Sequence, residues 1–163
     1  MFDQIRGAKI FSKFDLKSGY HQVRIKDEDI HNIVFQTRYG HYKFVVLPFR
    51  LTNAPTTFMC FMNTVLNKYF HKFVFNFIDD ILIYSKDENE HEEHLILVLQ
   101  TLREHQLYAK ISKCEFFKRQ IQYLVRIISD QGITIDPAKI KANGLYPNMS
   151  MTSSPLWVLH GKL

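Results

Sequence analysis

The sequence lacks the features of a membrane or secreted protein. No apolar run approaches the roughly 20 residues that cross a bilayer, and Met1-Phe2-Asp3-Gln4 lacks the charged and then apolar pattern of a signal peptide. Cysteine is scarce, and Cys60 and Cys114 are too few for a zinc site or a disulfide framework. We therefore expect an intracellular protein, cytoplasmic or nuclear, that is not secreted and has no membrane partner.

Repeats, low-complexity tracts and Gly/Ser linkers are also absent over most of the chain. The 163 residues are 46% hydrophobic, which is enough for one domain with a core. From Asn143 onward the composition shifts to Asn, Gly, Pro, Met, Ser and Thr, without helical or strand periodicity. We predict one compact unit over residues 1–142 and a poorly ordered tail over 143–163.

The charge of the chain is only mildly unbalanced. It has 21 Lys and Arg residues against 16 Asp and Glu residues, which gives a net charge of +5. Such an excess favours a polyanionic partner, nucleic acid among others, but does not demonstrate one.

Hydrophobic periodicity predicts several antiparallel hairpins. Alternation of apolar and polar residues is typical of half-buried strands, and apolar residues on both faces are typical of buried ones. A Gly in a short polar loop between two such runs indicates a hairpin turn. The predicted strands and hairpins cover 9–16, 33–37 with 42–46 around Gly40, 72–85, and 116–128 with 133–135.

Two amphipathic helices are predicted between the hairpins. Asn53 is a good N-cap, Pro55 suits a first turn, and an apolar stripe at three-and-four spacing runs on to Tyr69. A second helix begins in the acidic segment 88–94 and continues through an apolar stripe to Leu102. The stripe of the first helix is interpreted as core packing. The order of elements predicts an α+β fold, an antiparallel sheet with helices packed on one face.

Two features of these helices have ordinary explanations. The histidines of His91-Glu92-Glu93-His94 are three apart, whereas the metalloprotease pattern needs them four apart, so a solvated helix face is expected. Cys60 lies on the first helix and is expected to be an inert packing residue.

The carboxylates carry the functional argument. Asp79 and Asp80 are adjacent in the middle of an apolar hairpin, where two ionised carboxylates repel each other and lose hydration unless a cation or donors compensate them. A solvent-exposed turn is the alternative for an isolated pair. Asp15 ends a predicted strand, and pairing of that strand beside the hairpin would bring three carboxylates together. Such oxygen ligands suit Mg²⁺ or Mn²⁺, and two ions could serve phosphoryl transfer.

Three long motifs give the sequence a family resemblance. Segments 11–22 (FSKFDLKSGYHQ), 47–55 (LPFRLTNAP) and 77–85 (FIDDILIYS) occur in the order and spacing of gypsy-like retrotransposon reverse transcriptases. Further matches in 107–110 (LYAK) and 113–116 (KCEF) extend the resemblance over roughly residues 1 to 142. It implies a right-hand polymerase palm with part of the fingers, which extends a primer on an RNA or DNA template with deoxynucleotide triphosphates.

The resemblance also implies roles for individual residues. Asp15 and Asp79 would hold two Mg²⁺ or Mn²⁺ ions, with Asp80 completing the catalytic and metal-binding cluster. Tyr20 resembles the family's aromatic that excludes a ribose 2′-hydroxyl by steric collision, and Lys110 or Lys113 would lie near the triphosphate. The other implied nucleotide-binding residues are Leu16, Lys17, Ser18, Gly19, Phe49 and Arg50, the first four partly through backbone N–H groups. Those implied for template or primer are Asn53, Ala54, Pro55, Leu124 and Val125.

The chain departs from the family at two loops. Family members usually carry Gly at the position of Arg50, where a long side chain takes up space beside the nucleotide. We expect the Arg50 guanidinium either to fill the nucleotide pocket or to turn towards the acidic cluster. In the hairpin that grips the primer end, the family's Leu-Gly-His is replaced within Tyr123-Leu124-Val125-Arg126.

Activity also depends on regions that the family carries on either side of this segment. The rest of the fingers would precede Met1, and thumb, connection and ribonuclease H regions would follow Ala142, so a decayed element is one interpretation. The two hypotheses are an RNA-directed DNA polymerase palm, and a catalytically silent remnant with at most weak metal or nucleic-acid binding. A remote third hypothesis is another palm-like metal enzyme, such as a nucleotide cyclase. The motif at residues 47–55 argues against it.

Overall fold

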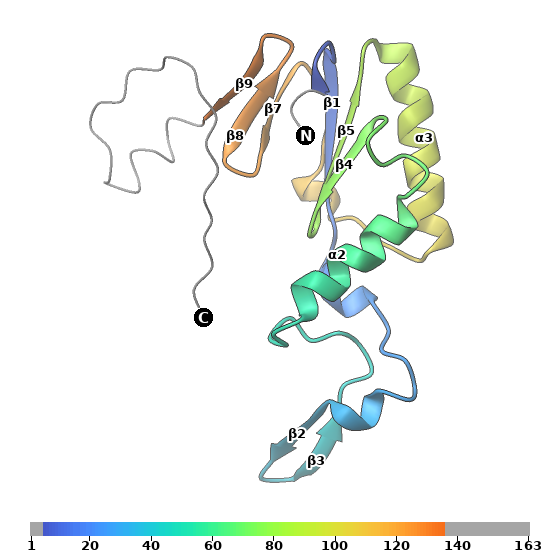
Figure 1. Ribbon diagram of the computed structural model, residues 1–163, viewed down its shortest axis with the longest axis vertical. Helices are drawn as coiled ribbons and strands as arrows, with labels where there is room; N and C mark the ends of the chain where they lie inside the picture. Colours follow the sequence, from blue (N-terminus) through green and yellow to red (C-terminus); the bar gives the residue numbers. More distant parts are fainter. Residues whose placement is uncertain (1–4, 136–163) are drawn as a thin grey trace, which may run out of the picture.

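The computed structural model describes residues 5–135, and its centre is a four-stranded antiparallel sheet in the order β4-β5-β1-β6. Helix α3 (Glu88–Glu104) lies along one face of this sheet, and helix α2 (Ala54–Val65) lies towards one end of it (Figure 1). The strands are β1 (Ile10–Asp15), β4 (Val74–Phe77), β5 (Asp80–Ser85) and β6 (Glu115–Lys118). The predicted α+β architecture is confirmed.

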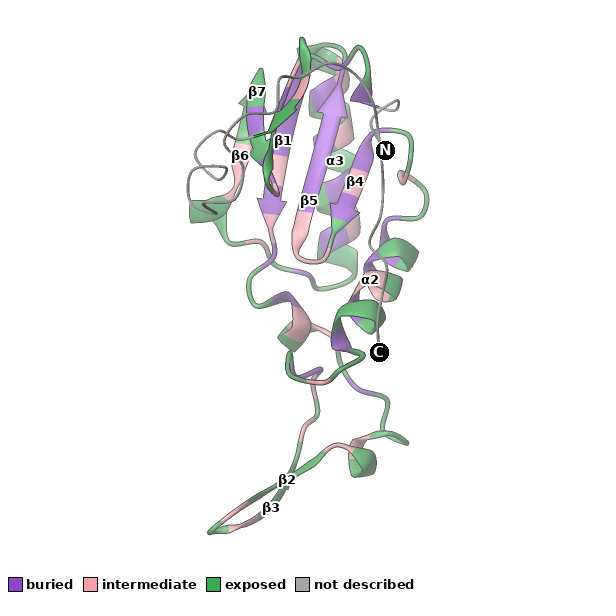
Figure 2. Ribbon diagram, turned by 60° about the vertical axis from the view of Figure 1, so that its left-hand side comes forward, coloured by how far each residue is buried: buried purple, intermediate pink, exposed green. Residues whose placement is uncertain are grey.

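Alternate residues of the central strands face two separate cores. Phe14 of β1 and Ile81 of β5 belong to the core that includes residues of both helices. Phe11 and Leu82 belong to a second core on the other side, which includes Tyr123. This division follows from the two-residue period of a strand, and it buries β1 and β5 on both faces (Figure 2).

The predicted hairpin at 33–46 is confirmed and extends away from the sheet. Strand β2 (Val34–Thr37) pairs with β3 (Gly40–Lys43), so the second strand begins and ends earlier than expected. Most of its residues are exposed (Figure 2). Short 3₁₀ helices, η1 (Gly19–Gln22) and η2 (Ile30–Asn32), lie between β1 and β2, and η3 (Ile111–Lys113) precedes β6.

The end of the described chain differs from the prediction of one hairpin. Strand β6 joins the central sheet, while β7 (Gln120–Tyr123), β8 (Arg126–Ser129) and β9 (Gly132–Ile135) form a separate antiparallel sheet. The turn between β7 and β8 is formed at Leu124 and Val125, and Leu124 has a φ of 58°. Large apolar residues there continue the strand pattern through the turn, so the sequence gives no turn signal.

Helix α2 begins as predicted but is shorter. It ends at Val65, although Leu66 and Tyr69 beyond it still pack in the core. Asn53 precedes the helix without a side-chain capping hydrogen bond. The interpretation of Cys60 as a packing residue is wrong, because its side chain is exposed.

The two histidines of α3 are not on a solvated face, so that expectation is also wrong. His91 is completely buried and lies between two hydroxyls, with Ser12 Oγ 2.7 Å from Nε2 and Ser85 Oγ 2.8 Å from Nδ1. Ser85 Oγ is also 2.8 Å from Nδ1 of His94, whose ring stacks on Phe73. Burial lowers the pKa of His91 to about 4, so the ring is neutral and ties α3 to β1 and β5.

A buried amide in β4 offers a test of the core. Asn76 is 2% exposed, and neither its Oδ1 nor its Nδ2 has a hydrogen-bond partner. A buried polar group without partners costs about 1 to 3 kcal/mol. Asn76→Val should therefore raise the free energy of unfolding by about 1 kcal/mol or more in urea denaturation. Asn67→Val at an exposed position is the control and should give no gain; a loss of stability in Asn76→Val would mean that the amide is satisfied.

Within residues 5–135, no helix is both long and apolar enough to span a membrane. The predicted tail at 143–163 and the predicted domain boundary at 142 lie outside the described residues.

Candidate active site

The turn between β4 and β5 carries Asp79 and is strained. Phe77 pairs with Asp80 across the hairpin, which leaves Ile78 and Asp79 as the turn residues. Ile78 has a φ of 53°, a left-handed conformation that costs a β-branched residue roughly 1 to 2 kcal/mol. Strain of this kind persists where surrounding contacts hold the backbone, and it concentrates at functional sites.

Strand register brings Asp15 next to the acidic turn. Asp15 pairs with Asp80 across β1 and β5, and the carbonyl of Asp79 accepts a hydrogen bond of 3.0 Å from the N–H of Leu16. The predicted pairing of the first strand beside the Asp-Asp hairpin is therefore confirmed.

The Asp79 carboxylate is the most perturbed acid of the site. Burial, and then the negative charges of Asp15 and Asp80, raise its pKa to about 6, while Lys113 acts in the opposite direction. Its Oδ1 is buried and has no hydrogen-bond partner. Burial also raises the pKa of Asp80, and Lys13 opposes this shift. An ionised Asp79 therefore has an uncompensated oxygen at this turn.

The loop after β1 closes against that oxygen. Gly19 is buried and contacts Asp79, and a Cβ at this position would collide with Asp79 Oδ1 and come within 2.8 Å of Phe58 Cζ. Tyr20 packs on Phe58 with ring centroids 5.0 Å apart. Burial and the Asp79 charge raise the pKa of Tyr20. The structure thus brings Gly19 and Tyr20 together with Asp79, as a nucleotide site would require.

Two backbone groups of this loop cannot serve as predicted. The N–H of Leu16 donates to Asp79, and the N–H of Lys17 donates to the carbonyl of Tyr108 at 2.8 Å. The Gln22 side chain adds a tie, because its Oε1 accepts from the N–H of Tyr108 at 2.6 Å. Phosphate contacts through backbone N–H groups thus remain a prediction for residues 18–20 only.

The structure distinguishes the two candidate lysines. Lys113 Nζ lies 3.0 Å from Asp15 Oδ2, and this contact raises the pKa of Lys113. Lys110 instead uses its backbone N–H, which donates to the carbonyl of Asp15 at 2.8 Å. Lys113 is therefore the lysine whose side chain reaches the acidic turn.

Arg50 does not turn towards the acidic cluster, whereas its place in a nucleotide pocket stays a prediction. Its guanidinium lies 5.6 Å from the centre of the Phe49 ring, and both residues are exposed. The ion pairs in residues 5–135 are Lys13–Glu115, Lys26–Glu28 and Lys113–Asp15, so the guanidinium does not pair with the acidic cluster. The exposed ring offers a cation–π contact without the desolvation that a buried site would require.

The predicted template residues at the start of α2 separate into two kinds. Asn53 and Pro55 are exposed, and Asn53 lines a cavity of about 590 Å³ together with Arg24 and Lys26. Ala54 is completely buried in the core, so its side chain cannot contact a template. Template contact stays a prediction for Asn53 and Pro55.

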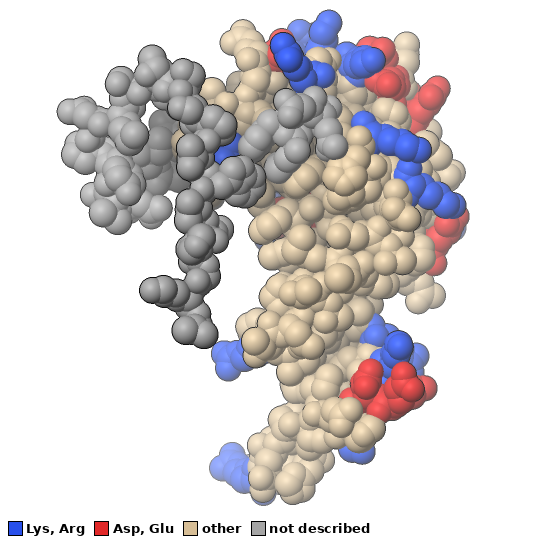
Figure 3. Space-filling view, viewed as in Figure 1, with Lys and Arg blue, Asp and Glu red and all other residues tan. Residues whose placement is uncertain are grey.

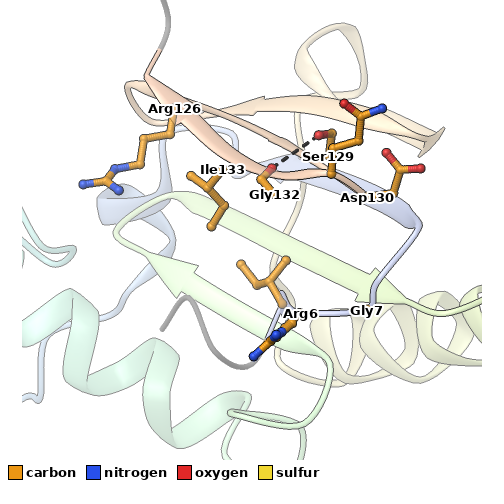
Figure 4. Close-up of a pocket in the computed structure, with 9 residues that line it drawn as sticks. Arg6, Gly7, Arg126, Ser129, Asp130, Gly132 and Ile133 are labelled. Atoms are coloured by element: carbon orange, nitrogen blue, oxygen red, sulfur yellow. Dashed lines mark hydrogen bonds between the residues drawn. The ribbon is translucent and has the colours of Figure 1, made fainter. Parts of the chain in front are cut away.

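The predicted primer residues lie at the tip of the β7–β8 hairpin. Val125 is exposed, whereas Leu124 packs partly against the second core. A cavity of about 520 Å³ lies further along this sheet, lined by Arg6, Arg126 and the β8–β9 turn, where Ser129 donates to the carbonyl of Gly132 (Figure 4). Its lining contains none of the three carboxylates.

Charged side chains are unevenly distributed over the surface. On the face shown in Figure 3, many of the described charged residues lie along the top and the right-hand edge, further Lys or Arg side chains lie at the left-hand and lower edges, and the middle is free of charge. The described residues therefore form no single large basic patch on this face.

The donor groups of the site are carboxylates, the kind of ligand that a divalent cation such as Mg²⁺ prefers. Within residues 5–135, no three acidic, histidine or cysteine side chains are arranged as a complete metal site. The unpartnered Asp79 Oδ1 and the raised pKa of Asp79 show that the described residues do not fully compensate the negative charge at this turn. Convergence of Asp15 and Asp79 on a shared ion stays a prediction.

Comparison with known proteins identifies the fold and the family. A family model described as "Reverse transcriptase (RNA-dependent DNA polymerase)" matches residues 1–128. The chain belongs to the reverse transcriptase family. The "Transposon Tf2-3 polyprotein" of Schizosaccharomyces pombe is 39% identical over 131 residues, which are 80% of this chain and 10% of that protein. The "Retrovirus-related Pol polyprotein from transposon 297" of Drosophila melanogaster is 36% identical over 149 residues, 89% of this chain and 14% of that protein.

Solved reverse transcriptases share the fold. The foamy viral protease-reverse transcriptase in complex with an RNA/DNA hybrid matches with a TM-score of 0.73 at 20% identity, over 86% of this chain and 19% of that chain. The same enzyme in complex with double-stranded DNA also matches with a TM-score of 0.73. The identification as a gypsy-like retrotransposon reverse transcriptase is confirmed. The chain spans only a small share of the length of these relatives.

Sequence reasoning missed one contact of this site and left a second one open. The Tyr123 hydroxyl donates to the carbonyl of Asp80 at 3.0 Å, and the Lys113 ammonium pairs with Asp15. No local pattern could reveal the first contact, because it joins two different sheets. The second was one of two alternatives in the sequence, and only the η3 geometry decides between them.

Proposed function

We propose that this reverse transcriptase chain supplies the palm, with part of the fingers, of an RNA-directed DNA polymerase that transfers a nucleotide from a deoxynucleotide triphosphate to a primer 3′-hydroxyl. The observation that carries the proposal is the Asp79 carboxylate, which has a buried, unpartnered oxygen facing the Gly19 loop and lies beside Asp15. Reverse transcriptases use divalent metal ions.

Different residues of the chain would bind the metal ions and the triphosphate. Asp15 and Asp79, with Asp80, would hold two Mg²⁺ or Mn²⁺ ions. When bound, these ions would activate the attacking hydroxyl and stabilise charge on the phosphoryl and leaving oxygens. Lys113 lies beside Asp15. When a metal ion binds Asp15, the Lys113 ammonium would be free to pair with a triphosphate.

The Gly19 loop would select and hold the incoming nucleotide. Tyr20 packs on the completely buried ring of Phe58, so its own ring has little freedom to move away from a ribose 2′-hydroxyl. A rigid ring excludes ribonucleotides by steric collision. Gly19 leaves room for the Asp79 carboxylate beside this ring.

A primer-extension assay tests the proposed function. The full chain would be incubated at high concentration with an RNA template, a DNA primer and one deoxynucleotide triphosphate in Mn²⁺. We expect addition of single nucleotides that Asp79→Asn abolishes. Long products are not expected, because the chain spans about a tenth of its relatives' length and positioning contributes about 7 to 11 kcal/mol to such reactions. No addition by the wild-type chain would contradict catalysis.

One observation favours a catalytically silent protein as the second candidate. Lys113 already neutralises Asp15, which weakens the attraction of that carboxylate for a metal ion. The Lys113 side chain is exposed, so water and salt screen this pair and it opposes metal binding only weakly.

Substitution of Lys113 separates the two candidates. Lys113→Met should strengthen Mn²⁺ binding up to about fivefold, because the competing ammonium is gone, and should weaken binding of a deoxynucleotide triphosphate. Both effects can be measured by isothermal titration calorimetry, with Lys110→Met as the matched control. Stronger Mn²⁺ binding with no nucleotide binding in either protein would support the silent candidate.

A further inference from the structure

We propose that Tyr123 is a positioning residue for the acidic turn, and that its hydroxyl couples the β7–β8 hairpin to Asp79 and Asp80. The inference rests on the proposed function, since the position of the turn matters for the reaction only if its carboxylates take part in it. Tyr123 itself touches no reacting group.

The acidic turn needs support from outside. Ile78 holds a left-handed conformation that its own side chain disfavours. Two hydrogen bonds from other segments, both 3.0 Å long, reach the turn and the strand residue next to it: the Leu16 N–H donates to the carbonyl of Asp79, and the Tyr123 hydroxyl donates to the carbonyl of Asp80 at the start of β5. The first bond fixes the turn to the residue that follows β1, and the second fixes the start of β5 to the other sheet.

Tyr123 is well suited to hold a carbonyl. It is 1% exposed and its ring meets the ring of Phe75 edge to face, with centroids 6.0 Å apart. A buried ring with few accessible rotamers keeps its hydroxyl in one place. Without the hydroxyl, the Asp80 carbonyl would lose this hydrogen bond. Because Tyr123 is buried, water could not easily replace it.

The same residue forms one side of the β7–β8 turn. Tyr123 pairs with Arg126, and the exposed Val125 lies between them at the hairpin tip. A second tie runs beside it, because the Lys13 ammonium of β1 donates to the carbonyl of Gln122 at 3.2 Å. A ligand that displaces the hairpin tip would therefore shift the Asp80 carbonyl as well.

The chain provides a matched control in a second buried tyrosine. Tyr84 lies on β5, four residues beyond Asp80, and is 5% exposed. Its hydroxyl has no hydrogen-bond partner. Tyr84→Phe and Tyr123→Phe thus remove the same atom from the same core, but only the second substitution removes a bond to the turn.

Hydrogen–deuterium exchange of the metal-free chain tests the positioning directly. In Tyr123→Phe, amide exchange in residues 77–81 should be roughly 2- to 10-fold faster, which corresponds to the loss of one neutral hydrogen bond. Exchange in residues 10–14 should not change. Tyr84→Phe should leave both segments as in the wild-type chain. Mn²⁺ titration followed by electron paramagnetic resonance should show a similar, roughly 2- to 10-fold loss of affinity for Tyr123→Phe alone.

The exchange and Mn²⁺ results together test the positioning role of Tyr123. Unchanged exchange in residues 77–81 would overturn the positioning role, and so would an equal increase in residues 10–14, which would show a general loss of stability. Faster local exchange with wild-type Mn²⁺ affinity would overturn the link to the site. If the wild-type chain binds no Mn²⁺ but exchange in Tyr123→Phe is locally faster, the proposed function fails and the hold of Tyr123 on the turn stands.

Discussion

Asp79→Asn should make the metal-free chain more stable at pH 8 while it abolishes the binding of Mn²⁺. We expect the free energy of unfolding to rise by about 1 to 2 kcal/mol in EDTA. In millimolar Mn²⁺ the order should reverse, because only the wild-type chain gains stability from the bound ion. Urea denaturation in the two buffers measures both effects.

The sign follows from the direction of the pKa shift. The folded-state pKa of Asp79, about 6, lies above its ordinary value of 3.8, mainly through burial. The folded chain therefore binds the proton more tightly than the unfolded chain, and stability is lost as the pH rises from about 4 to about 6. A shift of about two units corresponds to about 3 kcal/mol, which we reduce by about half because the carboxylate is partly exposed.

A neutral Asn has no such titration, so the gain in stability should disappear at pH 4. Asp27→Asn is the matched control: Asp27 is exposed, and its replacement should change neither stability nor Mn²⁺ binding. If Asp79→Asn destabilises the metal-free chain at pH 8, ionised Asp79 has a partner that compensates its charge, and the proposed site is wrong.

The side-by-side placement of Asp15 and the Asp79-Asp80 segment could be predicted from the sequence because it depends on local signals. Asp15 ends a strand with clear alternation, and Asp79 interrupts an apolar hairpin, so pairing of two elements is enough to place them side by side. The family resemblance of segment 11–22 indicated Gly19 and Tyr20, which the structure places beside Asp79. Backbone strain at Ile78 gave no signal, since an Ile in a two-residue turn is locally disfavoured.

The remaining structure depends on contacts between distant segments. Residues of β7, β8 and β9 pack in the second core, whereas β6 contributes to neither core and is held by its pairing with β1. That pairing joins segments about 100 residues apart, so the local apolar pattern does not reveal it. His91 looked solvated because acidic residues surround it in the sequence. Ser12 and Ser85, from two other strands, supply the hydrogen bonds that allow its burial.

Gly19→Ala should damage the site through contact alone. The added Cβ would collide with Asp79 Oδ1 and lie 2.8 Å from Phe58 Cζ, so the carboxylate or the ring must move. Overpacking of this kind costs about 1 to 3 kcal/mol of stability. Because the displaced oxygen is the unpartnered one, Mn²⁺ affinity should fall at least about tenfold, in line with the loss of one carboxylate ligand.

Gly7→Ala separates this collision from the general cost of replacing glycine. Gly7 has a φ of 89° and open space around it, so alanine there is strained by the backbone and meets no neighbour. Thermal unfolding and Mn²⁺ titration of both variants should show a loss of stability in each and a loss of metal binding in Gly19→Ala only. Wild-type Mn²⁺ affinity in Gly19→Ala would contradict the assignment of Asp79 as a metal ligand. A methyl group placed against that carboxylate should change its position and therefore its binding of an ion.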